Sequence, residues 1–119
     1  MATHNELGNK GEKLAVEYLQ KNNFRILECN WRFKKAEVDI IAIKKGVLAI
    51  VEVKTRSSDY FGNPQDFVNQ KKIQLLVEAV NEYVNSKNLD VEVRFDIIAI
   101  LKNQDNFEIK HLKDAFFYF

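Results

Sequence analysis

The chain has 119 residues, the length of one domain, so we expect a single domain over residues 1–119. With 46% hydrophobic and 29% charged residues, the composition is typical of a globular protein and excludes a disordered one. Cys29 is the only cysteine, which excludes a disulfide scaffold, and apolar runs such as Val47–Val51 are far shorter than the ~18 residues of a membrane span. The first residues lack the basic and apolar segments of a secretion signal, so the expected location is the cytoplasm.

The net charge of +1 does not by itself indicate a nucleic-acid binder, but the charges are unevenly spread. Residues 32–56 contain seven Lys and Arg but only three Asp and Glu. This local excess fits either a solvated hairpin with lysines at its tips or a surface that faces phosphates around an acidic centre.

The first half of the chain is predicted to form one helix and three strands. Residues 6–22 carry apolar side chains at helical spacing, with charged side chains on the opposite face. Strands are predicted at 24–33, 37–43 and 47–55. Residues 57–65, which contain a glycine and a proline, are predicted to form a loop.

The second half is predicted to form one helix and two strands. Asn69 is a candidate cap for a helix that runs to about residue 85. Strands are expected at 91–101 and 107–112, paired with each other. The order α-β-β-β-α-β-β predicts an α/β fold in which helices pack on a sheet.

Two carboxylates fall at facing positions of the hairpin predicted between residues 37 and 55. A two-residue turn at 45–46 or a four-residue turn at 44–47 gives the same register, with all the partners on one face. The expected partners are Ile43 and Leu48, Ile41 and Ile50, Asp39 and Glu52, and Glu37 and Lys54. Like charges at facing positions are destabilising unless a divalent cation or a shared proton neutralises them.

Three further charged side chains fall near this pair. Lys54 follows Glu52 by two residues on the same strand face, where its ammonium can stabilise a phosphate oxygen or position an attacking water. Glu12 lies on the flank of the apolar side of the first helix, either as a third carboxylate or as a glutamate stabilised by the helix dipole. Lys72 either reaches the same site or extends along the apolar stripe of the second helix. The residues alone leave open a metal-dependent phosphodiesterase site and a structural charge cluster.

The remaining polar residues of interest are assigned structural roles. His4 and His111 are isolated in the sequence and are expected at the surface, whereas Cys29 is expected to be a packed thiol. Arg94 and Asp96 share a strand face and are expected to form a structural ion pair.

Taken together, the motifs resemble those of the YraN-like family of small bacterial proteins. The matching segments run from the first helix almost to the end of the chain: Gly8-x-x-Gly11-Glu12-x-x-Ala15-x-x-Tyr18-Leu19, Asn30-Trp31-Arg32, Glu37-Val38-Asp39-Ile40-Ile41-Ala42, Val51-Glu52-Val53-Lys54-Thr55-Arg56, Arg94-Phe95-Asp96 and Asp114-Ala115-Phe116. That family belongs to the PD-(D/E)XK nuclease superfamily and is similar to archaeal Holliday-junction resolvases. The resemblance implies a restriction-endonuclease-like αβββαβ core with a mixed central sheet flanked by helices.

The resemblance also implies which residues form the site. Glu12, Asp39, Glu52 and Lys54 stand at the catalytic positions of the superfamily, and the implied metal is Mg²⁺ or Mn²⁺. In this scheme Asp39, Glu52 and the Val53 carbonyl bind the metal, Glu12 holds a metal-bound water or a second ion, and Lys54 orients the attacking water. Supporting roles are expected for two more residues, Glu37, which would hold Lys54 in place, and Lys72.

The expected partner is DNA, branched or duplex, with no membrane and no organic cofactor. Contacts to flanking phosphates are assigned to five basic residues: Arg32, Lys34, Lys35, Lys45 and Arg56. A homodimer is expected by analogy with the resolvases, with the aromatic residues 116–119 either at its interface or on the protein's own core. The resulting prediction is a metal-dependent DNA endonuclease. The alternatives are a nuclease-fold module for DNA repair, recombination or uptake that binds without cutting, and an interaction domain that does not bind nucleic acid.

Overall fold

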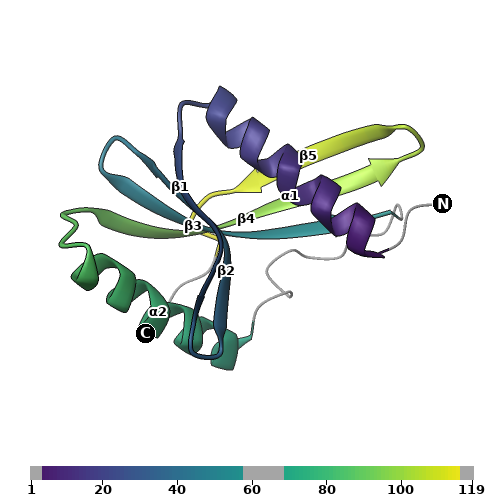
Figure 1. Ribbon diagram of the computed structural model, residues 1–119. Helices are drawn as coiled ribbons and strands as arrows, with labels where there is room; N and C mark the ends of the chain where they lie inside the picture. Colours follow the sequence, from purple (N-terminus) through teal and green to yellow (C-terminus); the bar gives the residue numbers. More distant parts are fainter. Residues whose placement is uncertain (1–3, 58–68, 116–119) are drawn as a thin grey trace.

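A computed structural model of the chain, drawn in Figure 1, describes residues 4–57 and 69–115. The elements are α1 (His4–Lys21), β1 (Arg25–Phe33), β2 (Ala36–Lys44), β3 (Val47–Arg56), α2 (Gln70–Ser86), β4 (Glu92–Asn103) and β5 (Asn106–Leu112). The predicted order of helices and strands is confirmed, and so is the α/β class. The predicted loop at 57–65 lies outside the described residues except for Ser57, and the aromatic residues 116–119 also lie outside them.

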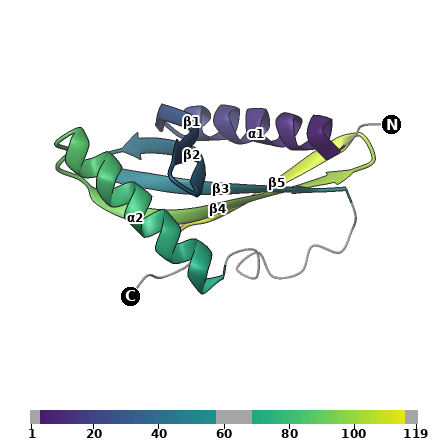
Figure 2. The ribbon, with the colours of Figure 1, turned by 60° about the horizontal axis from the view of Figure 1, so that its bottom comes forward.

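The strands form one mixed sheet in the order β1-β2-β3-β4-β5. Neighbouring strands are antiparallel except β3 and β4, which run parallel. Parallel neighbours need a long crossover, and here the connection includes α2. In Figure 2, α1 lies above the sheet and α2 lies below it, so each face of the sheet is covered by one helix.

Each helix buries one apolar stripe against its own face of the sheet. On one face, Ala15 and Leu19 of α1 pack with Ile40, Ala49 and Ile98 of the strands, among other residues. On the other face, Ile73, Leu76, Val80 and Tyr83 of α2 pack with Val38, Ile41, Leu48, Ile50, Phe95 and Ile97. A sheet buried on both faces explains why its central strands are almost continuously apolar.

The second helix begins as predicted. The side chain of Asn69 accepts a hydrogen bond from the backbone N–H of Lys72 at 2.9 Å, which satisfies one of the free amides of the first turn. Within the described residues, no helix combines the length and the apolar character needed to cross a membrane.

The hairpin of β2 and β3 confirms part of the predicted register. Lys44 pairs with Val47 across a turn in which Lys45 and Gly46 both have positive φ, and Ile43 and Ile41 face Leu48 and Ile50. The ladder ends at Ile40 and Val51. The predicted register is therefore confirmed as far as Ile40 and Val51, and the predicted pairs Asp39–Glu52 and Glu37–Lys54 lie beyond the last ladder pair.

The alternation of side chains along β2 changes at Asp39, next to this end of the ladder. Val38 packs in the core under α2, whereas Ile40, two residues later, packs in the core under α1. Side chains two residues apart on a regular strand share a face, so the alternation is broken between them. On the neighbouring strand, Asn30 has φ +52° at the corresponding position between the pairs Cys29–Ile40 and Trp31–Val38. Glu37, Asp39 and Glu52 nevertheless line one hollow with Leu75 and Leu76 of α2, on the face where Ile41 and Ile50 pack, in agreement with the prediction that these partners share one face.

Two structural expectations are also corrected. His111 is not a surface residue: its side chain is only 4% exposed, and its Nε2 lies 2.8 Å from Asp96. Cys29 is exposed and not packed. The expected ion pair of Arg94 with Asp96 is present, with Arg94 Nε 2.9 Å from Asp96 Oδ1.

Candidate functional site

The candidate site lies where β2 separates from β3. The backbone N–H of Val53 donates a hydrogen bond of 2.8 Å to Oδ2 of Asp39. The carboxylate of Asp39 thus accepts the Val53 N–H of β3 just beyond the last ladder pair. This bond fixes Asp39 beside the strand that carries Glu52. The two acids are therefore neighbours directly beyond the last pair of the predicted register, and the bond from Val53 holds Asp39 there.

Glu52 is buried and surrounded by cations. Its residue is 7% exposed, and it continues the face of β3 on which Leu48 and Ile50 pack against α2. Oε1 of Glu52 lies 2.6 Å from Nζ of Lys72 and 3.6 Å from Nζ of Lys54. A buried carboxylate requires such partners, because burying an unpaired charge costs on the order of several kcal/mol.

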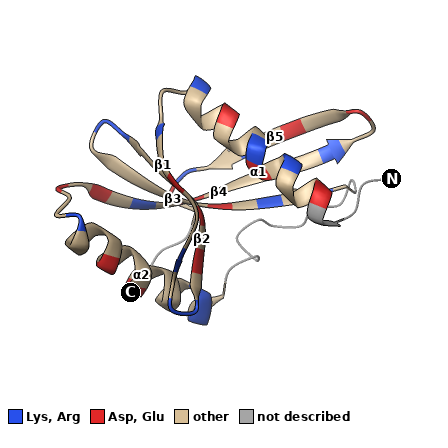
Figure 3. Ribbon diagram, viewed as in Figure 1, with Lys and Arg blue, Asp and Glu red and all other residues tan. Residues whose placement is uncertain are grey.

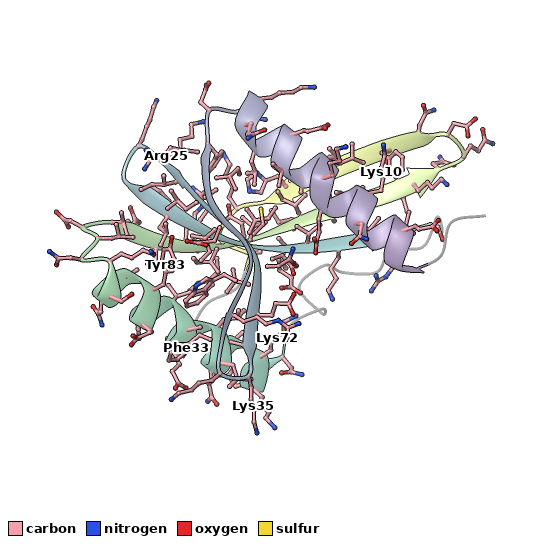
Figure 4. All side chains as sticks on the ribbon, in the orientation of Figure 1. Lys10, Arg25, Phe33, Lys35, Lys72 and Tyr83 are labelled. Carbon is pink, nitrogen blue, oxygen red and sulfur yellow. The ribbon has the colours of Figure 1, made fainter. Side chains whose placement is uncertain are left out.

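A hollow of about 350 Å³ opens beside the two carboxylates. It lies between the tip of the β1–β2 hairpin and the first turns of α2, where Figure 4 labels Lys35 and Lys72. Its walls are formed by Lys35, Ala36, Glu37, Asp39, Glu52, Lys72, Leu75 and Leu76. Figure 3 shows the same arrangement of charge, with basic residues at the hairpin tip and acidic residues along β2.

The electrostatics of the hollow perturb Asp39 strongly. Burial and the charge of Glu52 raise the pKa of Asp39 to about 7, with a smaller contribution in the same direction from Glu12. The hydrogen bond from Val53 and the charge of Lys72 lower this pKa, but they do not offset the rise. The charged form of Asp39 is therefore disfavoured mainly by burial and then by Glu52, and a nearby cation would stabilise it.

Glu12 lies close enough to influence Asp39 but belongs to the other face of the sheet. It does not line the hollow, and its Oε2 accepts a long hydrogen bond of 3.4 Å from the side chain of Asn30. The packing of α1 sets its position: a Cβ on Gly11 would lie 1.8 Å from Oγ1 of Thr55, so only glycine allows this approach of α1 to β3. The sequence prediction used Asn30 only as part of a family motif. Its side-chain type was the available signal, because asparagine is enriched at positive φ.

The other predicted site residues are dispersed around the hollow. Glu37 forms an ion pair with Arg32 at 2.9 Å, and Lys34 forms one with Glu78 at 2.9 Å. Arg56, at the end of β3, donates to the Thr55 carbonyl at 2.9 Å. Lys45 lies in the β2–β3 turn, at the far end of β3 from Glu52. The structure thus groups Asp39, Glu52, Lys54 and Lys72 closely, places Lys35 and Glu37 on the wall of the hollow, and separates Lys45 from them.

The donors available to a metal are all oxygens. Over residues 4–57 and 69–115, no group of three or more His, Cys, Asp or Glu side chains lies close enough together to hold a metal ion. The candidate ligands are the carboxylates of Asp39 and Glu52 and the backbone carbonyl of Val53. This set fits Mg²⁺ or Mn²⁺, because such ions bind through one or two carboxylates and retain several waters.

Comparison with known proteins places the chain in a family. The model of the uncharacterised protein family UPF0102 matches residues 11–100. A UPF0102 protein of Flavobacterium psychrophilum is 63% identical, and one of Christiangramia forsetii is 64% identical, each over 119 residues and the full length of both chains. A UPF0102 protein of Parabacteroides distasonis is 44% identical over 117 residues, which cover 98% of this chain and 97% of that protein. The family model covers most of the sequence, and two of these relatives align with it over its full length. The chain therefore belongs to the UPF0102 family.

Proposed function

We propose that this protein is a metal-dependent DNA endonuclease that hydrolyses phosphodiester bonds. The observation that carries the proposal is the pair formed by Asp39 and Glu52, which share one hollow while burial and mutual repulsion raise the pKa of Asp39 to about 7. A pair of carboxylates in this state attracts a divalent cation, and a lysine next to such a pair is suited to phosphate chemistry. The motif resemblance to the PD-(D/E)XK nucleases supports the same function.

In this proposal the residues around the hollow have different roles. Asp39, Glu52 and the Val53 carbonyl hold Mg²⁺ or Mn²⁺, and the Val53 N–H keeps Asp39 in place. When bound, the ion supplies Lewis-acid polarisation of the phosphate and a more acidic water. Lys54, whose ammonium lies 3.6 Å from Glu52, orients the attacking water or stabilises charge on the phosphate. Glu12 accepts a hydrogen bond from a water at the edge of the site.

The basic residues around the hollow are proposed to contact the DNA backbone. Lys35 lines the hollow, and Arg32 and Lys34 belong to the same hairpin arm. Arg32 and Lys34 form exposed ion pairs with Glu37 and Glu78 at 2.9 Å, and the role of Glu37 in holding Lys54 stays a prediction. Phosphate contacts of this kind are salt-sensitive and tolerant of sequence, so a branched or otherwise structure-defined DNA is the proposed substrate. A cytoplasmic homodimer is part of the proposal.

One observation favours a second function. Lys72 lies 2.6 Å from Glu52, so an internal ammonium already neutralises the acid that the metal would use. If this ion pair persists when divalent cations are present, the acids stabilise the fold and do not bind a metal. The protein is then a module that binds DNA without cutting it.

Cleavage of labelled DNA separates the two functions. The substrates are a four-way junction, a flap, a single strand and a linear duplex, each incubated with Mg²⁺, with Mn²⁺ or with a chelator. Wild type is compared with Glu52→Gln, which keeps the shape of the side chain, and with Glu108→Gln, which removes an exposed charge of β5.

We expect wild type and Glu108→Gln to cleave at least one substrate with a divalent cation and not with the chelator. The cleavage rate of Glu52→Gln should be lower than that of wild type by at least about a hundredfold, because the substitution removes a metal ligand. If wild type binds the DNA but cleaves none of the four substrates, the endonuclease proposal is wrong and the binding module is the better account.

A further inference from the structure

A second hollow, of about 190 Å³, lies at the other end of the sheet. It is lined by Phe24, Lys44, Lys45, Val47, Arg94 and Lys113, so every charged residue on its wall is a cation. These cations come from the end of β2 and the β2–β3 turn, from β4, and from the segment after β5, and these three parts of the chain are far apart in the sequence. Figure 3 shows the basic residues at the tip of the β2–β3 hairpin.

Arg94 is held rigidly in this wall. Its Nε and Nη2 atoms donate hydrogen bonds of 2.9 Å to the two carboxylate oxygens of Asp96, which is fully buried. Asp96 is fixed in turn by His111 at 2.8 Å and by the backbone N–H of Asp114 at 3.0 Å. A guanidinium has five N–H donors, so the pair with Asp96 leaves further donors on a group that is already oriented.

The lysines of the wall are also positioned by their surroundings. The ammonium of Lys44 lies 5.3 Å from the centre of the Phe24 ring. Lys45 has φ +50° in the tight turn with Gly46, and the Gly46 carbonyl accepts the N–H of Glu92, which fixes the turn to the start of β4. Lys113 precedes Asp114, whose N–H binds Asp96.

The charge of the hollow is incompletely neutralised by the protein. The carboxylates of Asp96, Asp114 and Glu92 act on Arg94, but none of them lines the hollow. The charge of Arg94 is offset by its ion pair with Asp96, but the three lysines of the wall repel one another, and an anion that enters the hollow reduces this repulsion. A guanidinium and several ammonium groups are the donors that phosphate groups use in proteins.

We propose that this hollow binds a phosphomonoester dianion, carried either by the end of a nucleic-acid strand or by a free nucleotide. A terminal phosphate has about −1.5 to −2 charges near neutral pH and one substituent, so it matches three lysines with Arg94 as a further hydrogen-bond donor, and it can enter a small hollow. An internal phosphodiester carries one charge and a sugar on each side, so it fits this hollow less well.

The hollow is separate from the candidate site of Asp39 and Glu52. Val47 and Glu52 are five residues apart on β3, which corresponds to about 16 Å along the strand. Arg94 pairs with Ala49, whose side chain belongs to the α1 core, whereas Glu52 faces Lys72 of α2. The proposed binding needs no metal, so it can be tested in the presence of a chelator and stands or falls independently of DNA cleavage.

The test is calorimetric titration of the full chain at low salt with a chelator. The ligands are adenosine 5′-monophosphate against adenosine, and a single-stranded oligonucleotide with a 5′-phosphate against the same strand with a 5′-hydroxyl. Wild type is compared with Lys45→Gln/Lys113→Gln and with the control Lys13→Gln/Lys110→Gln, which removes the same charge from exposed lysines outside the hollow.

We expect wild type and the control to bind each phosphorylated ligand at least about tenfold more tightly than its unphosphorylated partner, as expected for charged hydrogen bonds to a dianion. The hollow variant should lose this preference. Tighter binding of the phosphorylated strand than of the nucleotide identifies a strand end as the ligand, and equal binding identifies the phosphate group alone. Equal affinity of wild type for phosphorylated and unphosphorylated ligands, or an equal loss in both variants, would overturn the proposal.

Discussion

The charge of Asp39 should lower the stability of the fold. Its pKa is about 7 in the folded chain, mainly because of burial and then because of Glu52, against about 3.9 in an unfolded chain. Between these two values the folded state binds the extra proton, so the stability of wild type falls as pH rises from about 4 to above 7.

We therefore expect Asp39→Asn, whose side-chain oxygen still accepts the Val53 N–H, to be more stable than wild type by about 1–3 kcal/mol at pH 8. The difference should vanish near pH 4. Urea unfolding at the two pH values measures it, with Asp105→Asn, an exposed acid of the β4–β5 turn, as the control. If Asp39→Asn is destabilised equally at both pH values, the folded state does not disfavour the charged form of Asp39.

Lys72 should control how strongly the site binds a divalent cation. Its ammonium lies 2.6 Å from Glu52, so a metal that uses Glu52 has to displace it. We expect Lys72→Gln to bind Mn²⁺ about tenfold more tightly than wild type, which corresponds to about 1.4 kcal/mol. Calorimetric titration with Mn²⁺ measures this directly, without DNA.

Lys71→Gln is the matched control, because Lys71 is the preceding, exposed residue of the same helix. It should bind Mn²⁺ as wild type does. Unchanged or weaker binding by Lys72→Gln would mean that Lys72 does not occupy the position of the cation.

At the scale of the elements, the contact of α1 with β3 depends on one glycine. A Cβ on Gly11 would lie 1.8 Å from Oγ1 and 2.9 Å from Cβ of Thr55, whereas a Cβ on Gly8 of the same helix meets nothing within 4 Å. We expect Gly11→Ala to destabilise the protein by about 1–3 kcal/mol, because the helix has to move away from the sheet. Gly8→Ala should instead stabilise it by about 0.5–1 kcal/mol through helix propensity.

Thermal unfolding of the two variants measures these opposite effects. Thr55→Ala removes the nearest atom, so it should restore part of the stability of Gly11→Ala. If both alanine variants are stabilised, α1 does not approach β3 as closely as the structure shows.

The sequence predicted these elements well because their periodicities are strong, but it could not predict the interruption of β2. Residues 38–43 are apolar apart from Asp39, and the strand is buried on both faces, so the hydrophobic pattern does not indicate which face each side chain takes. The two acids were predicted to be neighbours on the correct strands, but the bond from Val53 that joins them was not predicted.

At the scale of the whole molecule, one buried polar network joins segments from both ends of the chain. His111 of β5 lies 2.8 Å from Asp96 of β4 and 3.1 Å from the hydroxyl of Tyr18 in α1, and Arg94 completes the network. Tyr18 and His111 are separated by 93 residues in the sequence, so no local pattern indicates that they meet. This is why His111 was predicted at the surface, although the pair of Arg94 and Asp96, two residues apart on one strand face, was predicted correctly.

The network should be a major source of stability because Asp96 is fully buried. Burial alone would raise the pKa of Asp96, but hydrogen bonds from His111, Arg94 and the Asp114 backbone together lower it below its ordinary value. Asp96→Asn leaves the charge of Arg94 without its partner, so we expect a loss of about 3–5 kcal/mol in urea unfolding at pH 7. Asp114→Asn, which keeps the backbone N–H that binds Asp96, should lose far less.

The pH dependence of this loss of stability shows whether Asp96→Asn acts by removing the carboxylate charge or by altering the packing. A carboxyl whose pKa is lowered by folding contributes stability that is complete above about 3.9, the value in an unfolded chain, and that is lost as pH falls through the folded value. The difference between wild type and Asp96→Asn should therefore be constant from pH 7 to about 5 and shrink in stronger acid. If the difference does not change in acid, the substitution acts through packing alone, and the charge of Asp96 does not contribute to the stability of the network.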